Sequence, residues 1–136
     1  MKIINIANTF KNFLSVVLTT CIYLLGGFDI ALKSLLIIIC VDYFTGVLSA
    51  IYNKKLNSKI GFKGILKKFS YFCIIALSVI IDDIMGQSGV IRTLVIYFFV
   101  ANDGISILEN VGEMGIPLPQ KLVEVLEQLK NKSNDK

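Results

Sequence analysis

The sequence contains too little charge to cover a soluble globular domain. Charged residues make up 18% of the 136 residues and hydrophobic residues 54%, whereas a typical soluble domain has about 25% charged residues. The mean hydropathy of +0.71 points in the same direction. A helix that is apolar all round is stable when lipid surrounds it. The composition therefore predicts an integral membrane protein.

The sequence also lacks the residues and spacings on which most enzymes depend. It has no histidine, the commonest general base and metal ligand at neutral pH. No phosphate-binding loop, nucleophile–base set or pair of catalytic carboxylates is present. The three cysteines lie far apart in apolar segments, and we interpret them as small buried residues: Cys21, Cys40 and Cys73. We expect no catalytic residue, no cofactor and no metal site.

The net charge of +4 does not indicate a nucleic-acid partner. The lysines lie beside apolar segments, and Phe and Tyr lie within those segments instead of alternating with a basic stripe. Lysines in such positions orient membrane helices. Each also attracts anionic lipid headgroups, by about 1 kcal/mol near the surface. We therefore expect anionic lipid as a partner, and no nucleic acid.

Four apolar segments are candidates for membrane-crossing helices, which need about 20 residues each. They cover residues 10–25, 30–52, 69–85 and 90–108. The first is polar at its start and ends at the helix breakers Gly26 and Gly27. It either crosses the membrane or lies in the interface as an amphipathic arm. Residues 1–110 are thus expected to form an all-α bundle of about four transmembrane helices.

The distribution of charge predicts the topology of this bundle. The loop expected at residues 53–68 has six lysines and no acidic residue: Lys54, Lys55, Lys59, Lys63, Lys67 and Lys68. The positive-inside rule places this basic loop on the cytoplasmic membrane surface. Lys2 and Lys11 place the N-terminus there too, and two hairpins return the C-terminus. Asp82 and Asp83 suit the outer interface, where we interpret them as solvated residues.

Residues 111–136 are expected to form a cytoplasmic region outside the bundle. Pro119 is suited to the first turn of a helix. Apolar residues then recur at helical spacing opposite charged ones: Leu118, Leu122, Val125, Leu126 and Leu129. This spacing predicts a short amphipathic helix, which docks on the bundle, lies on the membrane or pairs with copies of itself. The polar tail, residues 131–136, is expected to be disordered.

Two carboxylates fall at membrane depth, Asp42 in the second segment and Asp103 in the fourth. Inserting such a carboxylate costs roughly 2.5–3.5 kcal/mol, so it usually faces water or the interior of a bundle. Helical spacing groups both with further polar residues, and the candidate set is Asp42, Thr45, Ser49, Arg92, Asn102, Asp103 and Ser106. We expect them to line a water-filled path in a homo-oligomer, or to bond to neighbouring helices. Gly46 and Ala50 form a small-xxx-small pair for close helix packing.

Two blocks of sequence resemble the bacteriophage holin family of Gram-positive phages, which includes the holins linked to secretion of large clostridial toxins. The first block comprises residues 42–51, 54–64 and 67–68, and the second comprises residues 106–110, 115–119 and 122. Members often carry Asn-Glu where this chain has Asn102 and Asp103. The resemblance implies a protein of the bacterial cytoplasmic membrane that self-assembles and opens a lesion for an endolysin or a toxin.

Two other functions remain open at the level of sequence. A small proton-coupled transporter would use Asp42 or Asp103 to take up and release protons, and its flux would saturate with substrate. An antiholin would block the pores of a partner by forming mixed oligomers with it. Expressed alone, an antiholin would be inert.

Overall fold

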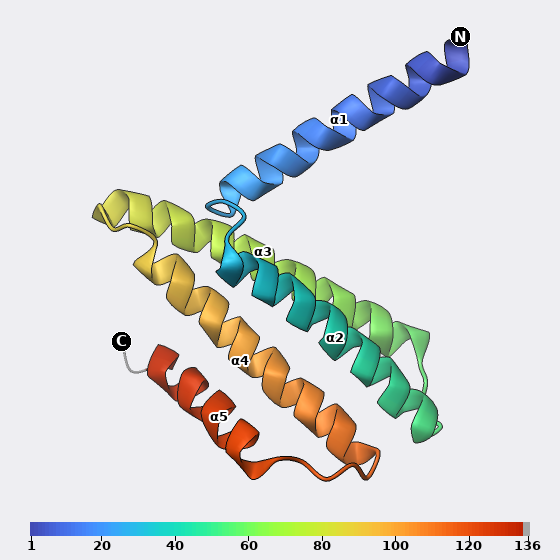
Figure 1. Ribbon diagram of the computed structural model, residues 1–136, viewed down its shortest axis with the longest axis vertical. Coiled ribbons are helices and arrows are strands. Elements are labelled where there is room, and N and C mark those ends of the chain that lie inside the picture. The colour runs from blue at the N-terminus through green and yellow to red at the C-terminus, as the bar shows by residue number, and fades with distance from the viewer. Residues whose placement is uncertain (135–136) are drawn as a thin grey trace.

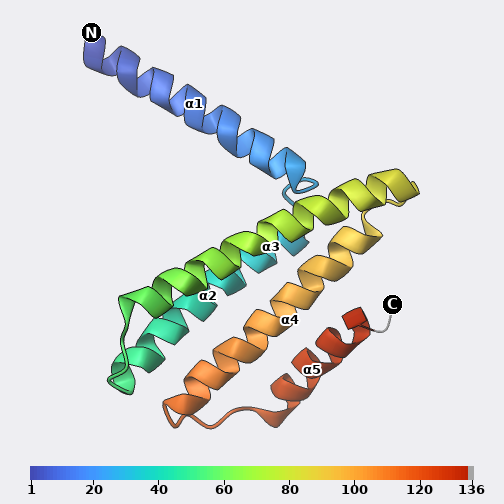
Figure 2. The same ribbon diagram turned by 180° about the vertical axis from the view of Figure 1, so that it is seen from behind.

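The computed structural model describes residues 1–134, and these residues form five helices. The helices are α1 (Lys2–Leu24), α2 (Ile30–Tyr52), α3 (Ser58–Met85), α4 (Val90–Glu113) and α5 (Gln120–Asn134). α2, α3 and α4 run side by side as a bundle, α5 lies along α4, and α1 extends away from the others (Figures 1 and 2). The prediction of an all-α chain is confirmed for the described residues.

Three of the helices, α2, α3 and α4, are long and apolar enough to cross a membrane. α2 has the bounds that the sequence predicted, and α4 begins at the predicted Val90 but continues to Glu113. α1 begins before the predicted first segment, covers all of it except Leu25, and ends before Gly26 and Gly27, which both have positive φ. Because α1 is not among the three apolar helices, a fourth transmembrane helix stays a prediction.

The basic segment that we expected to be a loop is mostly helical. The side chain of Asn57 caps α3 by accepting a hydrogen bond from the amide of Lys59 at 2.9 Å. Lysine is a good helix former and no proline interrupts the next turns, so α3 includes residues 58–68. The turn before it holds Lys54 and Lys55, and the other lysines are on α3: Lys59, Lys63, Lys67 and Lys68. The loop prediction was therefore wrong for residues 58–68.

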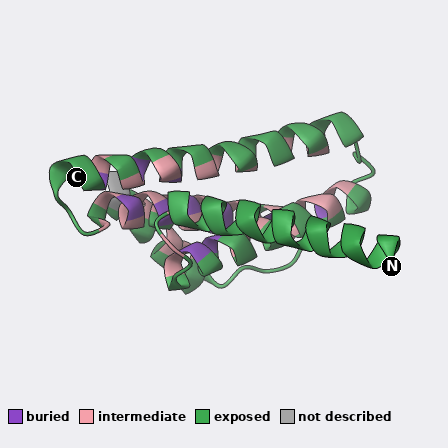
Figure 3. Cartoon of the chain, turned by 90° about the horizontal axis from the view of Figure 1, so that it is seen from above, coloured by how far each residue is buried: buried purple, intermediate pink, exposed green. Residues whose placement is uncertain are grey.

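The bundle has a small apolar core and a large apolar exterior. Leu35 of α2, Ile75 of α3 and Ile96 of α4 are fully buried, and Phe99 of α4 joins them. Most of the remaining helix surface is exposed (Figure 3), and it carries many large apolar side chains. Water would disfavour such a surface by about 25 cal/mol per Å², whereas lipid is a suitable solvent for it. The packing fits helices that face lipid on the outside.

The three cysteines are exposed in the structure: Cys21, Cys40 and Cys73. Our interpretation of them as buried residues was wrong. Cys40 and Cys73 lie outside the narrow stripes that α2 and α3 turn towards their neighbours, and Cys21 is on α1, which has no buried residue.

The C-terminal amphipathic helix docks on the bundle, which was one of the three arrangements left open. α5 packs along α4 in the opposite direction (Figure 1). Leu126 lies over Gly104 so closely that a Cβ atom on this glycine would be 3.0 Å from the Cδ2 atom of Leu126. α5 continues to Asn134, so the expected disordered tail is helical up to that residue. Residues 135–136 of the tail lie outside the described residues.

Candidate functional site

One lysine and two carboxylates meet inside the bundle and form what we call the ion triad. Lys68 of α3 makes ion pairs with Asp42 of α2 and with Asp103 of α4, the latter at 2.5 Å between Nζ and Oδ2. Asp42 is 7% exposed and Asp103 is 1% exposed. Because a lone buried ion is costly, removing one member of such a group strongly destabilises the rest. The ion triad therefore holds the three apolar helices to one another.

Tyr71 links the ion triad to the apolar core. Its hydroxyl donates a hydrogen bond to Oδ1 of Asp103 at 3.0 Å. Its ring stacks on Phe99, with 3.9 Å between the ring centroids. The ammonium of Lys68 lies 5.3 Å from the centre of the same ring, within the range of a cation–π interaction. The side chain of Tyr71 thus contacts the ammonium through its ring and one carboxylate through its hydroxyl.

Asn110 ties α4 to α2 beside the ion triad. Its Nδ2 atom donates to Oδ1 of Asp42 at 3.2 Å and to Oγ1 of Thr45 at 3.1 Å. The hydroxyl of Thr45 donates in turn to the carbonyl of Asp42 at 3.1 Å. A Cβ atom on Gly46 would lie 3.5 Å from Nδ2 of Asn110. This is an ordinary van der Waals distance, so a role of Gly46 in close helix packing stays a prediction.

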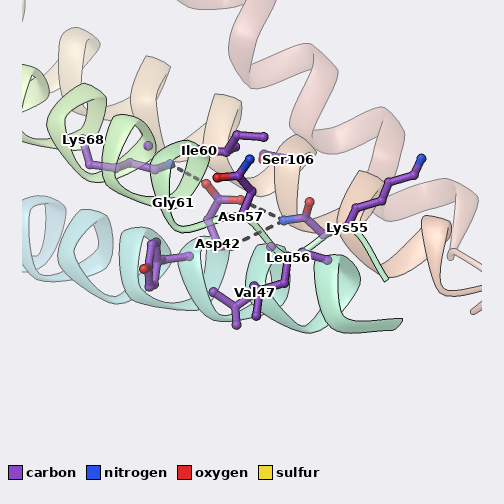
Figure 4. A pocket seen from close by; sticks show the side chains of 14 residues that line it. Asp42, Val47, Lys55, Leu56, Asn57, Ile60, Gly61, Lys68 and Ser106 are labelled. Carbon is purple, nitrogen blue, oxygen red and sulfur yellow. Dashed lines mark hydrogen bonds and ion pairs between the residues drawn. The ribbon is translucent and has the colours of Figure 1, made fainter. Parts of the chain in front are cut away.

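A cavity of about 330 Å³ opens beside the ion triad, between α2 and the first half of α3. Asp42 and Lys68 face each other at one end of it, and Lys55 lies towards the other end (Figure 4). Ser106 of α4 and Ala50 of α2 also line it. Since a water molecule occupies about 30 Å³ in the liquid, the cavity has room for several. The cavity therefore offers space for water beside the charged groups.

Arg92 forms a second polar site, at the first turn of α4. Its guanidinium donates to Oδ2 of Asp29 at 2.7 Å and to the carbonyls of Leu25 and Gly27 at 2.5 and 2.9 Å. Arg92 is thus buried although charged, and it fastens the α1–α2 connection to α4. Asp29 lies outside the apolar helices. The hydrogen bond from Arg92 holds the pKa of the Asp29 carboxyl group below its ordinary value.

Asp82 closes the α3–α4 hairpin. Its carboxylate accepts hydrogen bonds from the backbone amides of Ile91 and Arg92 at 3.0 and 2.9 Å. Amides in the first turn of a helix have no partner within the helix, so the carboxylate supplies one. Asp82 is buried and Asp83 is exposed. The interpretation of Asp82 as a solvated interface residue was therefore wrong.

The structure divides the predicted polar residues into separate groups. Four lie in the ion triad or beside it: Asp42 and Asp103 are members, and Thr45 and Ser106 are neighbours. Ser49 is further along α2, where its hydroxyl donates to Oε2 of Glu113 at 2.7 Å. Arg92 is at the other end of α4, and Asn102 is half-buried beside Asp103. A role of all these predicted polar residues in lining a pore stays a prediction.

Sequence reasoning missed Lys68 and Tyr71 as interior residues. Lys68 was assigned to the membrane surface because it belongs to a run of lysines. Its position immediately before an apolar segment, in a chain with two carboxylates at membrane depth, is the signal that indicates a counter-ion. Tyr71 follows three residues later and so shares its helix face.

Within residues 1–134, cysteine and acidic side chains form no group of three that would hold a metal ion.

Comparison with known proteins now assigns the chain to a family. The model of the bacteriophage holin family matches residues 19–131, which include all of α2, α3 and α4. The chain belongs to this holin family. The resemblance seen in the sequence blocks is thereby confirmed. The holin family is a non-enzymatic membrane protein family, and the three apolar helices agree with a holin-type membrane protein.

Relatives of this holin-family chain occur in clostridia, Listeria and Bacillus. It is 41% identical to an uncharacterized 14.9 kDa protein in the nagH 3′ region of Clostridium perfringens, over 81% of this chain and 84% of the relative. It is 41% identical to the uncharacterized protein Lin0175 of Listeria innocua, over 83% and 81%. Identity to the uncharacterized protein YqxH of Bacillus subtilis is 33%, over 81% and 78%. No solved structure matches the chain.

Proposed function

We propose that this chain is a holin that assembles with copies of itself in the bacterial cytoplasmic membrane and opens a water-filled lesion. The lesion releases an endolysin or a toxin from the cytoplasm. Both chain ends lie on the cytoplasmic side in this proposal. Membership of the holin family and the three apolar helices support it, and the position of α5 is the observation that carries it.

α5 presents a charged face at the depth of a membrane-crossing helix. Gly104, which Leu126 covers, is about 13 Å along the helix axis from the end of α4 at Glu113. At this level α5 leaves polar side chains exposed, Glu124, Glu127 and Gln128, next to the exposed apolar side chains of Val125 and Leu129. Lipid does not solvate charged groups at such depth without a large cost. A docked α5 therefore requires water on its outer side, which an assembly around an aqueous lumen provides.

The ion triad is a second group of charges that water would stabilise. Two carboxylates share one ammonium, so the bundle interior has an excess of acidic groups beside a cavity that water can enter. In the proposed lesion, polar residues of α2 and α4 extend this wet surface. The exposed lysines on the first turns of α3 attract anionic headgroups at the cytoplasmic surface: Lys59, Lys63 and Lys67.

Inducible expression in a bacterium, with and without a cytoplasmic endolysin, tests the proposal. Membrane potential and culture turbidity are followed together. Abrupt depolarisation, with clearing of the culture only when the endolysin is present, is the expected result, because only a lesion passes a folded enzyme. Steady growth with an intact potential contradicts the proposal. Delayed lysis when the chain is co-expressed with another holin then identifies an antiholin.

A small proton-coupled carrier is the second candidate, and the ion triad favours it. One carboxylate of the ion triad can take up a proton and become neutral while the other remains the counter-ion of the ammonium. Such a carrier gives flux that saturates with substrate and leaves the cells alive. Replacing Asp42 or Asp103 by asparagine would abolish that flux without any change in the membrane potential of resting cells.

A further inference from the structure

A stripe of polar side chains runs along α1. Five residues follow one another at intervals of three and four positions and form what we call the α1 stripe: Asn5, Asn8, Asn12, Ser15 and Thr19. At about 100° per residue they lie within roughly 80° of the helix circumference. With about 1.5 Å of rise per residue, the stripe is roughly 21 Å long. These residues therefore form one continuous polar face.

The opposite face of α1 is apolar, and the helix stands alone. Ile6, Phe10 and Val17 are on that face and are exposed. α1 has no buried residue, and both ribbon views show it extending away from the other helices (Figures 1 and 2). The described part of the chain therefore leaves the α1 stripe uncovered.

The two threonine hydroxyl groups of α1 outside the stripe already have partners within the helix. Thr9 donates to the carbonyl of Asn5 at 2.9 Å, and Thr20 donates to the carbonyl of Val16 at 2.8 Å. Within residues 1–134, by contrast, no side chain of the stripe makes a hydrogen bond. Polar groups in hydrocarbon must find partners inside the protein, as the ion triad does in the bundle. A membrane-inserted α1 therefore needs partners for the stripe residues inside the predicted first segment, Asn12, Ser15 and Thr19.

We propose that the α1 stripe is a self-association surface that pairs, in parallel, with the α1 stripe of a second copy. An asparagine amide both donates and accepts hydrogen bonds, so the stripe is complementary to itself. Its average spacing of about 3.5 residues is the period that keeps one face of two helices in contact along a left-handed pair. Copies with the same topology are parallel, so that Asn12 meets Asn12 of the partner helix. The inference deepens the self-assembly in the proposed function and rests on it.

Pairing also accounts for the lower apolarity of α1 compared with α2, α3 and α4. When two stripes face each other, the pair presents mainly isoleucine, leucine, valine and phenylalanine to lipid. Lys11 is at the edge of the stripe and at the cytoplasmic end of the predicted first segment, where its long side chain reaches the headgroups. Two paired α1 helices thus cross a membrane that a single α1 crosses poorly.

Disulfide cross-linking of the full-length chain in bacterial membranes tests the pairing. In a background with Cys40→Ala and Cys73→Ala, the native Cys21 reports on the face roughly 160° from the stripe centre. The stripe variant adds Cys21→Ala and Ser15→Cys, which replaces only an oxygen by sulfur. A disulfide needs Cα atoms within about 7 Å, so we expect at least about fivefold more covalent dimer from the stripe variant than from Cys21.

A second pair of variants tests the amide chemistry. Asn12→Leu in the stripe variant makes α1 more apolar, which favours insertion, but removes the self-complementary amide. We expect it to lower the yield of covalent dimer severalfold, whereas the matched change Phe10→Leu on the opposite face leaves the yield unchanged. Equal dimer yields from Cys21 and from Ser15→Cys would overturn the proposal. So would modification of the Ser15→Cys thiol by a membrane-impermeant reagent without cross-linking, because the stripe would then face water.

The depolarisation assay separates this inference from the proposed function. Cross-linking through the stripe in cells that keep their membrane potential supports the pairing and contradicts the lesion. Abrupt depolarisation without cross-linking through the stripe contradicts the pairing and leaves the lesion in place.

Discussion

The ammonium of Lys68 on α3 lies 2.5 Å from the carboxylate of Asp103 on α4. The same ammonium also pairs with Asp42 on α2. A single lysine side chain therefore joins all three of the helices that are apolar enough to cross a membrane. The arrangement makes the bundle depend on a residue that the sequence places in a run of lysines.

Lys68→Met is expected to destabilise the bundle by about 3–5 kcal/mol, because it leaves two buried carboxylates without their counter-ion. Membrane abundance and thermal stability of the full-length chain in detergent measure the effect. Lys67→Met is the matched control, since Lys67 is exposed on the same turn and its loss removes the same charge. Equal losses from the two variants would show that the run of lysines matters only through its total charge.

Asp29→Asn is expected to lower thermal stability at neutral pH and to have less effect in acid. The pKa of Asp29 in the folded chain is below its ordinary value of 3.8 because Arg92 donates a hydrogen bond to it. Ionised Asp29 therefore stabilises the fold above pH 3.8, and this contribution is lost as the pH falls through the lowered pKa. Thermal melts of both proteins across this range measure the difference.

Asparagine at position 29 is a clean test because it is as good a helix N-cap as aspartate. The existing cap bond, from the amide of Leu32 to Oδ1 at 2.9 Å, has an equivalent in the variant. Asp83→Asn is the control, since Asp83 is exposed and forms no ion pair among residues 1–134. A stability difference for Asp29→Asn that persists unchanged in acid would contradict the role of the Arg92 pairing.

Gly104→Ala is expected to weaken the docking of α5. The added methyl group would be 3.0 Å from Leu126 Cδ2 and 3.1 Å from Cδ1, and overpacking of this kind typically costs about 1–3 kcal/mol. Faster trypsin cleavage at lysines of α5 in inverted membrane vesicles measures the undocking. Gly112→Ala is the control, because its methyl group would meet Leu118 at an ordinary 3.5 Å. If α5 were equally protected from trypsin in both variants, the contact between Leu126 and Gly104 would not form in the membrane-inserted protein.

Gly26→Ala is expected to be more damaging than Gly27→Ala. Both glycines have positive φ, so alanine strains the backbone by roughly 1–2 kcal/mol at either position. Only at Gly26 would the Cβ atom also meet Arg92, at 2.6 Å from Nε; at Gly27 nothing lies within 4 Å. Thermal stability in detergent should therefore fall further for Gly26→Ala. Identical losses would mean that Arg92 moves aside without cost.

Helix positions could be predicted from the sequence because they depend on local patterns. The second apolar segment has the bounds of α2, and the first helix ends before the glycine pair as expected. α3 began earlier than predicted, since the Asn57 cap and the absence of proline outweighed the reading of a lysine run as a loop. The two sequence blocks likewise indicated the family that the comparison confirmed.

The sequence by itself determined an all-helical membrane protein of the holin family, with acidic residues at membrane depth and an amphipathic C-terminal helix. Only the tertiary structure decided that Lys68 lies between Asp42 and Asp103, that Asp82 caps α4, and that α5 docks over Gly104. Hydrophobic periodicity and caps act within a few turns of one helix. The partner of a buried charge depends instead on which helices become neighbours and at what height, and residues distant in the chain jointly determine this.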